Sequence, residues 1–510
     1  MERKTDLLHA ENCLLLQFIR LTKRHKLFTG ATLVHLYDSG LMDVCVIGAG
    51  PAGVAAALRA VQLGAKTTLI ANGEFGGMAA NDGPVPVRTL AHAARLLRDA
   101  HQLGRYGIAV GDPVLEYSRL LERVREVVED VRKHSSFRGL IDSLGVAVHE
   151  HAGDARFTDS NTVETGKGLR LKADKFIICT GGKSRSLTVP GFELTATHSD
   201  AWSLTSVPPS MMVIGAGATG AQVASIFNAF GSRVQLFQAG PRILPTEDQD
   251  VSVAVAAAFR NSGIVVNESF GEIESFEKTP NGVRMNFTKD GARRGAEAAL
   301  AVVAIGWASN AASLNLASAG VETNRKGFVQ VDACMRTSAP NIFAAGDITG
   351  NLMLVPQAVQ GAFVAATNAV RDSSMPYGSQ VSPIGSFTDP EYAQVGLTEA
   401  QAREAHDIVK AVVNFDTTAR TIIDGRTAGF CKLIADRATS RILGCHVVGE
   451  RAVEITQVAS IAIAGGMRVD QLAQVPLSFP TYAGILGRVA AKAAHLLNLQ
   501  VGWVGNQIEN

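Results

Sequence analysis

A Gly-x-Gly-x-x-Gly motif that occurs twice constrains the fold of this sequence more than any other feature. Each copy follows a short apolar segment, 43–47 or 211–214, and precedes a helix-forming stretch and a second strand, 67–70 or 233–237. In such a β-α-β unit the first glycine makes the tight turn, the second lets the backbone approach a pyrophosphate, and the third lets the helix pack on the strand. The helix N-terminus then holds the anion. The copies place their glycines at Gly48, Gly50 and Gly53 and at Gly215, Gly217 and Gly220.

The two units predict an α/β fold with two Rossmann-like dinucleotide-binding domains. They imply two dinucleotides, or one dinucleotide and one degenerate site. Two further segments have the pattern of a strand that ends in a glycine turn. Segment 175–182 ends in Thr-Gly-Gly, and segment 340–347 ends in Gly-Asp. A Ser-, Pro- and Gly-rich segment, 371–383, marks a domain boundary, and the chain beyond it has the pattern of an α+β domain. The other predicted elements are a helical stretch over 89–134, a strand-rich stretch over 264–304, strands over 429–435 and 441–448, and helices over 399–405 and 453–465.

Composition and charge narrow the range of partners. Of the 510 residues, 46% are hydrophobic and 19% are charged, as in a globular protein, and the net charge is +1. A charge this small creates no long-range electrostatic field that would attract nucleic acid or an acidic surface. No uninterrupted apolar run reaches the ~18 residues of a membrane span. The six cysteines contain no Cys-x-x-Cys pair, which predicts free, buried thiols in a reducing compartment such as the cytoplasm.

An N-terminal extension, residues 1–41, precedes the first predicted strand. Segment 6–22 has the pattern of an amphipathic helix, and a basic patch over 23–26 follows it. Its acidic residues and short apolar run fit neither a signal peptide nor a transit peptide. Contact with a membrane surface and a frayed tail are both open interpretations. We expect the functional protein to begin at Met42 and residues 1–41 to be dispensable.

Six strings along the chain point to one known family. They are 46–53, 180–182, 215–220, 337–347, 387–398 and 441–444. Together they resemble the flavin-dependent pyridine nucleotide-disulfide oxidoreductases, which include dihydrolipoamide dehydrogenase, mercuric reductase and glutathione reductase. The resemblance covers about residues 43–495.

The resemblance implies a domain order and two cofactors. It implies an FAD-binding domain in two parts, 42–190 and 310–375, with an NAD(P)-binding domain, 191–309, nested between them. A dimerisation domain over 380–498 would form a homodimer. The implied FAD contacts are Gly48, Gly50, Gly53, Asn72, Gly77, Arg88, Thr180, Gly181, Asp347, Met353, Leu354, Val355 and Pro356. The implied NAD(P) contacts are Gly215, Gly217, Gly220, Gln238 and Gly306.

Several departures from the family pattern bear on the chemistry. The two cysteines of the family's redox disulfide align with Ala79 and Pro84, and disulfide exchange needs a thiolate. The histidine that serves those sulfurs, and the glutamate that orients it, become Phe479 and Gly484. Dithiol chemistry by the family route is therefore not expected. The phenol of Tyr482 is either a proton donor or a packing aromatic at the dimer interface.

Other departures surround the flavin ring and the two riboses. The family's Lys–Glu pair becomes Arg88 and Gln222, and the arginine keeps the cation that steadies a reduced, anionic flavin. The aromatic lid of the nucleotide site becomes Ala218. The ribose-binding acidic residues become Ala71 and Gln238, and Asn72 is a possible replacement on the FAD side. Because Gln238 does not repel a 2′-phosphate and Arg242 is close in sequence, the choice between NADH and NADPH stays open.

These observations predict an FAD-dependent NAD(P)H oxidoreductase of diaphorase type. Reduced flavin would pass electrons directly to a small acceptor such as a quinone, in a pocket near Arg88, Phe479 and Tyr482. The alternative is a catalytically degenerate flavin- or dinucleotide-binding dimer that acts as a sensor or partner protein. The acceptor itself stays undetermined.

Two smaller clusters complete the predictions. His149 and His151 would share one face of a strand, but they have no third ligand nearby, so no metal is expected. Glu247, Asp248 and Asp250 are interpreted as a solvated helix start.

Overall fold

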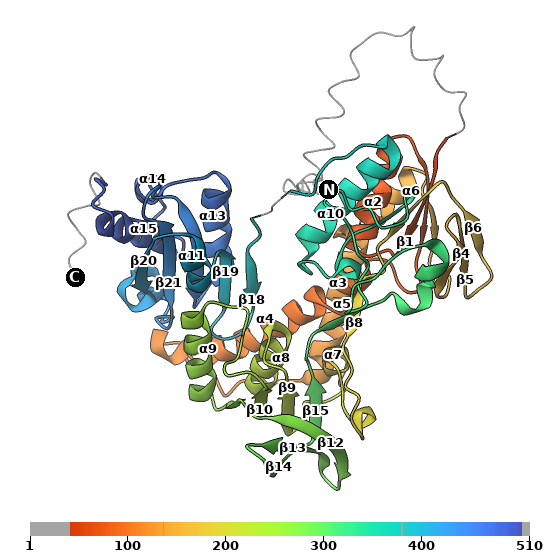
Figure 1. Ribbon diagram of the computed structural model, residues 1–510. Coiled ribbons are helices and arrows are strands. Elements are labelled where there is room, and N and C mark those ends of the chain that lie inside the picture. The colour runs from red at the N-terminus through yellow and green to blue at the C-terminus, as the bar shows by residue number, and fades with distance from the viewer. Residues whose placement is uncertain (1–40, 136, 379–380, 502–510) are drawn as a thin grey trace, which may run out of the picture. The chain divides into compact units, whose positions relative to one another are not determined.

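The computed structural model describes residues 41–135, 137–378 and 381–501 (Figure 1). The chain divides into two units, Met1–Met42 and Asp43–Asn510, and the description below concerns the second. The helix predicted over 6–22 lies outside the described residues, so that prediction is untested. No helix in the described ranges is long and apolar enough to cross a membrane.

A five-stranded parallel sheet forms the core of the first dinucleotide-binding fold. Its strand order is β17-β7-β1-β2-β3, with every neighbouring pair parallel. Helices α2 and α10 pack against each other beside this sheet (Figure 1). The strands are β1 (Asp43–Ile47), β2 (Lys66–Ile70), β3 (Ala147–His149), β7 (Lys175–Ile178) and β17 (Ile342–Ala344), and the helices are α2 (Pro51–Gln62) and α10 (Val355–Arg371).

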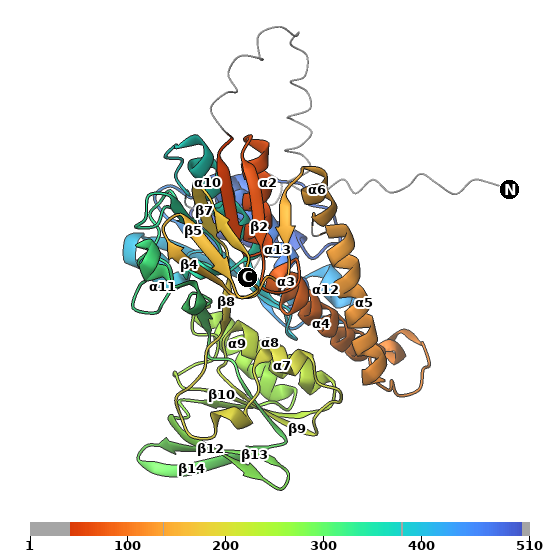
Figure 2. The same ribbon diagram turned by 90° about the vertical axis from the view of Figure 1, so that its right-hand side faces the viewer.

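A small antiparallel sheet shares a hydrophobic core with this parallel sheet. Phe157 and Val163 of the small sheet pack in one cluster with Cys45 and Ile47 of β1 and with Phe176 of β7. The small sheet consists of β4 (Ala155–Asp159), β5 (Thr162–Thr165) and β6 (Arg170–Lys172). A helical excursion separates β2 from β3, and α4 packs along α5 (Figure 2). Its elements are α3 (Gly77–Asn81), α4 (Pro84–Ala100), α5 (Tyr117–Ser135) and α6 (Arg138–Ser143).

The second dinucleotide-binding fold is inserted into the first. The chain passes into it through β8 (Gly182–Ser184) and returns through β16 (Trp307–Ser309), and these two strands pair antiparallel. Its parallel sheet has the order β11-β10-β9-β15, and the meander β12-β13-β14 lies beside it (Figure 2). The elements are α7 (His198–Trp202), β9 (Ser210–Ile214), α8 (Ala218–Ala229), β10 (Arg233–Gln238), α9 (Gln249–Asn261), β11 (Val265–Glu268), β12 (Glu272–Thr279), β13 (Gly282–Lys289), β14 (Ala292–Ala298) and β15 (Leu300–Val303).

The C-terminal part is a five-stranded antiparallel sheet with helices packed on it. The strand order is β18-β19-β22-β21-β20, and helices α13 and α15 share its hydrophobic core. Its strands are β18 (Ile384–Ser386), β19 (Tyr392–Gly396), β20 (Ile408–Asn414), β21 (Phe430–Asp436) and β22 (Ile442–Val448). Its helices are α11 (Glu399–Ala405), α12 (Ala419–Ile423), α13 (Ala452–Ala464), α14 (Val469–Ala473) and α15 (Gly484–Leu496).

The fold class predicted from the sequence is confirmed: two Rossmann-like units, the second nested in the first, and a C-terminal α+β domain. One local prediction is wrong. Strand β3 ends at His149, and His151 lies in a turn with φ +52°. The two histidines therefore do not share a strand face, because the chain turns between them.

Candidate functional site

A continuous cavity of about 1020 Å³ runs along the carboxyl ends of the first parallel sheet. The residues that directly follow β1, β2, β7 and β17 all contribute to its wall. Ligands of open α/β sheets bind at this edge, where the strand order reverses. The volume is at the upper end of the range for small-molecule sites, as an extended dinucleotide requires.

The glycines of the first motif close the turn between β1 and α2. Gly48 has φ +111°, and a Cβ placed on it would lie 2.2 Å from the Cys179 carbonyl oxygen. A Cβ on Gly53 would lie 1.7 Å from the Gly48 carbonyl oxygen, so only glycine lets the helix start this close to the turn. Gly50 directly precedes α2, and no side chain caps the N-terminus of this helix. The free N–H groups of this helix start fit a pyrophosphate.

The structure places nearly all predicted FAD residues on the wall of this one cavity. The residues that line it are Gly48, Gly50, Asn72, Gly77, Arg88, Thr180, Gly181, Asp347, Met353, Leu354 and Val355. Gly53 and Pro356 do not belong to the wall among the described residues. Gly53 lies behind the turn, against Gly48, and Pro356 lies in the first turn of α10. Burial raises the pKa of Asp347.

A carboxylate that the sequence reasoning missed lies at the β2 end of the cavity. The Asn72 Nδ2 atom donates a hydrogen bond of 2.6 Å to Asp154 Oδ1, and both residues line the wall. Asp154 follows β3 in the chain, whereas the family's acidic residue follows β2, where Ala71 stands here. A carboxylate therefore lies at this end of the cavity on a different segment of the chain, and a search at one sequence spacing could not find it.

We expect Asp154→Asn to weaken FAD binding. Loss of a charged hydrogen-bond acceptor costs about 1–3 kcal/mol, or roughly 5- to 150-fold in Kd. Flavin fluorescence during titration of the apoprotein measures this change. Asp159→Asn, at the exposed last residue of β4 and not on the cavity wall, is the control and should leave Kd unchanged. Equal affinities of the two variants would remove Asp154 from the site.

The wall where the sequence analysis aligns the family's disulfide is formed by α3, the start of α4 and the turn between them. Ala79, Asp82 and Pro84 all line the cavity there. Of the described cysteines only Cys179 contributes to the wall, and burial raises its pKa to about 12. Burial also raises the pKa of Cys45, inside β1, to about 12. Both thiols are therefore protonated at neutral pH.

Two further sulfurs come close together elsewhere in the fold. The Cys431 and Cys445 Sγ atoms are 3.9 Å apart and fully buried on β21 and β22. They belong to the core of the C-terminal sheet. Neither is a wall residue of the cavity described above.

Arg88 and Gln222 both face the cavity but make few polar contacts. The Arg88 guanidinium carbon lies 3.0 Å from the centroid of the Phe387 ring, and its Nη1 atom has no hydrogen-bond partner. Burial lowers the pKa of Arg88 to about 10, against the opposing effect of Glu391 and Glu454. The Gln222 Oε1 atom is buried without a partner, and its Nε2 atom donates to Ala218 O at 3.3 Å. Unsatisfied buried polar atoms on a cavity wall indicate a ligand that completes them.

A group of residues around one histidine, His198, lies on the same wall and was not predicted from the sequence. We call this group the histidine cluster. His198, the first residue of α7, lies between Ser184 and Asp82, and the Trp307 ring packs against it edge-on with centroids 4.9 Å apart. His198, Asp82 and Trp307 line the cavity. These residues are far apart in the sequence, and none of them belongs to a recognisable motif.

The second glycine motif repeats the geometry of the first. A Cβ on Gly215 would lie 2.4 Å from Ala304 O, and one on Gly220 would lie 1.8 Å from Gly215 O. The Gln238 Oε1 atom accepts a 3.0 Å hydrogen bond from Ala216 N. Gly306, with φ +107°, directly precedes β16. The predicted NAD(P) residues Gly215, Gly217, Gly220 and Gln238 therefore surround one turn.

Arg242 has a structural role in its own loop. Its guanidinium donates to the carbonyl oxygens of Leu244, Pro245 and Glu247 at 3.2, 2.9 and 3.0 Å. A guanidinium engaged with three carbonyls has little capacity left for a 2′-phosphate. The contacts of Arg242 therefore give no preference for NADPH, and the choice between NADH and NADPH stays open.

Phe479 and Tyr482, the two residues predicted for the acceptor pocket, do not line the cavity of their own chain. Phe479 is 85% exposed, on the segment before α15. The Tyr482 hydroxyl donates to Asp424 Oδ2 at 2.8 Å, and its ring packs on the core of the C-terminal sheet. Burial and Asp424 raise the pKa of Tyr482. These contacts favour the packing interpretation of Tyr482, and an exposed Phe479 is available to a second subunit.

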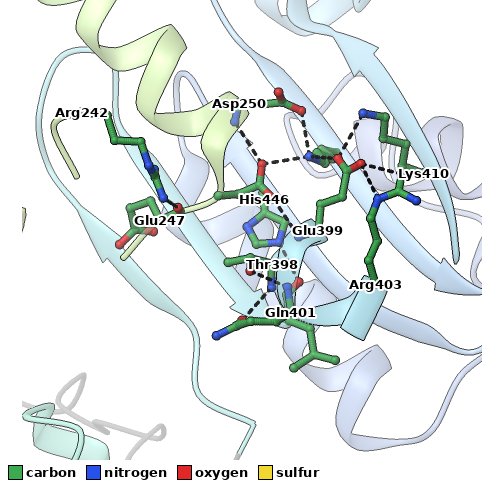
Figure 3. Close-up of polar contacts among 12 residues, drawn as sticks. Arg242, Glu247, Asp250, Thr398, Glu399, Gln401, Arg403, Lys410 and His446 are labelled. Carbon is green, nitrogen blue, oxygen red and sulfur yellow. Dashed lines mark hydrogen bonds and ion pairs between the residues drawn. The ribbon is translucent and has the colours of Figure 1, made fainter. Parts of the chain in front are cut away.

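The acidic segment before α9 was predicted to be solvated, and that prediction is wrong for Glu247 and Asp248, whereas Asp250 is exposed as expected. Glu247 and Asp248 are buried, and burial raises the pKa of Glu247 to about 7. The Lys432 ammonium, 1% exposed, donates to Asp248, Asp250 and Glu399 at 2.8, 2.7 and 2.6 Å. Figure 3 shows Asp250 and Glu399 of this cluster, with Arg403 and Lys410 bonded to Glu399. The buried Asp248 is thus neutralised by Lys432 of a distant strand, in an ion cluster that joins the start of α9 to β21 and to the start of α11.

The fold and the cavity define a class of protein: an oxidoreductase that binds two dinucleotides, one on each Rossmann-like unit. The chain belongs to the pyridine nucleotide-disulphide oxidoreductase family. The family profile matches residues 42–362, and the profile of the family's dimerisation domain matches residues 382–490. The resemblance seen in the sequence is thereby confirmed at family level, and the second match supports a homodimer.

Named relatives agree with this assignment. Mercuric reductase of Lysinibacillus sphaericus is 31% identical over 453 residues, covering 88% of this chain and 82% of that protein. Dihydrolipoyl dehydrogenase of Thermus scotoductus is 32% identical over 473 residues, covering 89% and 99%. The solved structure of the HOCl-induced flavoprotein disulfide reductase RclA from Escherichia coli superposes with a TM-score of 0.79 at 25% identity, covering 88% and 99%. Members of the family use FAD and NAD(P)H, and this chain is an FAD-dependent NAD(P)H oxidoreductase.

Proposed function

We propose that this oxidoreductase works without a redox disulfide and passes electrons from reduced flavin directly to a small acceptor such as a quinone. The observation that carries the proposal is the identity of the wall residues Ala79 and Pro84, which offer no thiol where the family's disulfide aligns. The relatives named above are a mercuric reductase and a dihydrolipoyl dehydrogenase, and neither name refers to a quinone. The proposal therefore concerns only the step in which reduced flavin gives its electrons to the acceptor.

The chain's own residues have separable roles in this proposal. When bound, FAD would take up a hydride from NAD(P)H and release electrons to the acceptor. The turn around Gly48 and the start of α2 hold its pyrophosphate, and Arg88 supplies a buried cation near the ring. The small side chains of Ala79 and Ala218 leave space on the wall for flat reactants. We also propose the domain division at residues 190, 309 and 375–380, and a cytoplasmic location, which the five described free cysteines support.

The number of electrons taken up per flavin tests this proposal. We expect anaerobic titration of the holoprotein with dithionite to end at about two electrons per FAD, because none of the described residues offers a second redox centre beside the flavin. A redox disulfide beside the flavin would add two more electrons. The double variant Ala79→Cys/Pro84→Cys is the matched control and should approach four. An end point of four in the unmodified protein would refute the proposal.

A second candidate function is a flavin- or dinucleotide-binding dimer without turnover. Four positions of the family's catalytic apparatus differ together: Ala79, Pro84, Phe479 and Gly484. Anaerobic mixing with NADH or NADPH separates the two functions. Bleaching of the flavin band followed by steady NAD(P)H consumption with a quinone supports the enzyme, and a band that does not bleach supports the sensor.

A further inference from the structure

The histidine cluster on the cavity wall links the two dinucleotide-binding folds. His198 begins α7 of the second fold, Asp82 lies between α3 and α4 of the first, and Ser184 lies on the connecting strand β8. The Ser184 Oγ and His198 Nδ1 atoms are 2.8 Å apart. The other ring nitrogen, Nε2, lies 3.8 Å from Asp82 Oδ2 and 3.5 Å from Ser199 Oγ. One nitrogen is therefore held by a hydroxyl, and the other is directed toward a carboxylate on the cavity wall.

Burial and two nearby carboxylates act in opposite directions on the protonation of His198. The residue is 4% exposed, and burial lowers its pKa, while the charges of Asp82 and Asp200 oppose that shift. Ser199 Oγ donates to Asp82 Oδ2 at 2.5 Å and so fixes the carboxylate. The Trp307 ring packs edge-on against the imidazole. A buried histidine without function would be expected to have both nitrogens bonded within the protein, whereas here Nε2 makes only long contacts.

We propose that His198 is the proton donor for reduction of a quinone-class acceptor, with Ser184 and Asp82 as its positioning residues. The overall reaction is NAD(P)H + H⁺ + quinone → NAD(P)⁺ + hydroquinone. The nucleotide supplies two electrons and one hydrogen, and the remaining proton comes from the Nε2 atom of the imidazolium. Neutral His198 then takes a proton back from solvent through the Asp82 side of the cavity, where the Asp82 side chain is 34% exposed. This inference rests on the proposed function.

Two acceptors with different proton needs test the role of His198. His198→Asn keeps an amide near the Nδ1 position, where it can bond Ser184, and removes Nε2. We expect kcat/KM for a benzoquinone to fall about 100-fold, within the usual range for loss of a general acid. Reduction of ferricyanide, which takes electrons without protons, should be unchanged, as should the rate at which NAD(P)H bleaches the flavin.

A second histidine–carboxylate pair provides the matched control. The His406 Nδ1 atom lies 2.9 Å from Asp436 Oδ2 in the C-terminal domain, and His406→Asn should leave both acceptor rates unchanged. Equal loss with quinone and with ferricyanide in His198→Asn would show a structural role only. Unchanged quinone reduction would refute the inference while leaving the proposed function intact, since that function is tested separately by the electron count per FAD and by bleaching of the flavin by NAD(P)H.

The titration of His198 gives a readout that needs no turnover. NMR of the oxidised holoprotein with labelled histidine should show one imidazole resonance that disappears in His198→Asn and titrates below the usual pKa. Asp82→Asn removes the facing charge that raises this pKa, so the resonance should titrate at still lower pH. The pH above which quinone reduction declines should move down with it. A titration that Asp82→Asn does not move would contradict the assigned arrangement.

Discussion

Replacement of Lys432 by methionine should lower the free energy of unfolding by about 3–5 kcal/mol, the usual cost of removing one partner from a buried ion cluster. Lys432 is 1% exposed and holds the buried Asp248 together with Asp250 and Glu399. Without the ammonium, a carboxylate stays buried with only backbone donors. The first transition in a urea titration of the holoprotein measures the loss.

Lys410→Met is the matched control because Lys410 contacts the same Glu399 from an exposed position. Exposed pairs contribute about 0–1 kcal/mol, so a Lys432 variant that loses no more than the Lys410 variant would contradict the assigned cluster.

The cluster also predicts a pH dependence. Burial opposes ionisation of Glu399, but hydrogen bonds from Lys432, Arg403 and Lys410 lower its pKa to about 2. Lys432 and the Glu399 amide likewise outweigh burial and lower the pKa of Asp248. A carboxyl whose pKa is depressed in the folded state adds stability above its unfolded pKa of ~4, and that stability is lost as the pH falls toward 2. Stability measured between pH 5 and 2 should therefore fall less steeply in Lys432→Met than in the unmodified protein.

Gly53→Ala should yield protein that is largely free of flavin. The new Cβ would lie 1.7 Å from the Gly48 carbonyl oxygen, so the start of α2 must move away from the turn that holds the pyrophosphate. Overpacking of this kind costs about 1–3 kcal/mol, which is roughly 5- to 150-fold in the Kd for FAD. The ratio of flavin to protein absorbance after purification, and FAD titration of the apoprotein, measure the effect.

The same substitution at Gly139 is the control for Gly53→Ala. Gly139 lies in α6, and a Cβ there would have no atom within 4 Å. Gly139→Ala should keep its full flavin content and be slightly more stable, because alanine favours a helix over glycine. If both variants retain FAD equally, the close approach at Gly53 is not needed for binding.

Much of the fold could be predicted because its signals are local. The two glycine motifs follow β1 and β9 as expected, since a strand, a tight turn and a helix leave one continuous trace in the sequence. Helix α11 spans Glu399–Ala405 as predicted, and Thr398 and Gln401 form a capping box at its start. The linker prediction also agrees with the gap between α10 and β18.

The candidate site was predictable only where the family pattern reached it. Asp154 contacts Asn72 from a different strand, and Asp82 contacts a histidine that begins a helix of the other dinucleotide-binding fold. Lys432 neutralises Asp248 from far along the chain. Such pairs depend on which strands become neighbours, and the spacing of residues in one segment carries no information about that. The solvated interpretation of Asp248 failed for this reason.

The pairing of β8 with β16 has a further consequence for how such a chain can be assembled. The strand through which the chain leaves the first dinucleotide-binding fold lies beside the strand through which it returns, and Arg185 N donates to Gly306 O at 3.0 Å. Topologically, everything between them is one long hairpin loop, and a short turn from residue 184 to residue 307 would restore an uninterrupted scaffold. An exchange of one nucleotide module for another therefore needs two chain junctions at this ribbon, and the new module must also match the core that the present one shares with α4 and the C-terminal sheet.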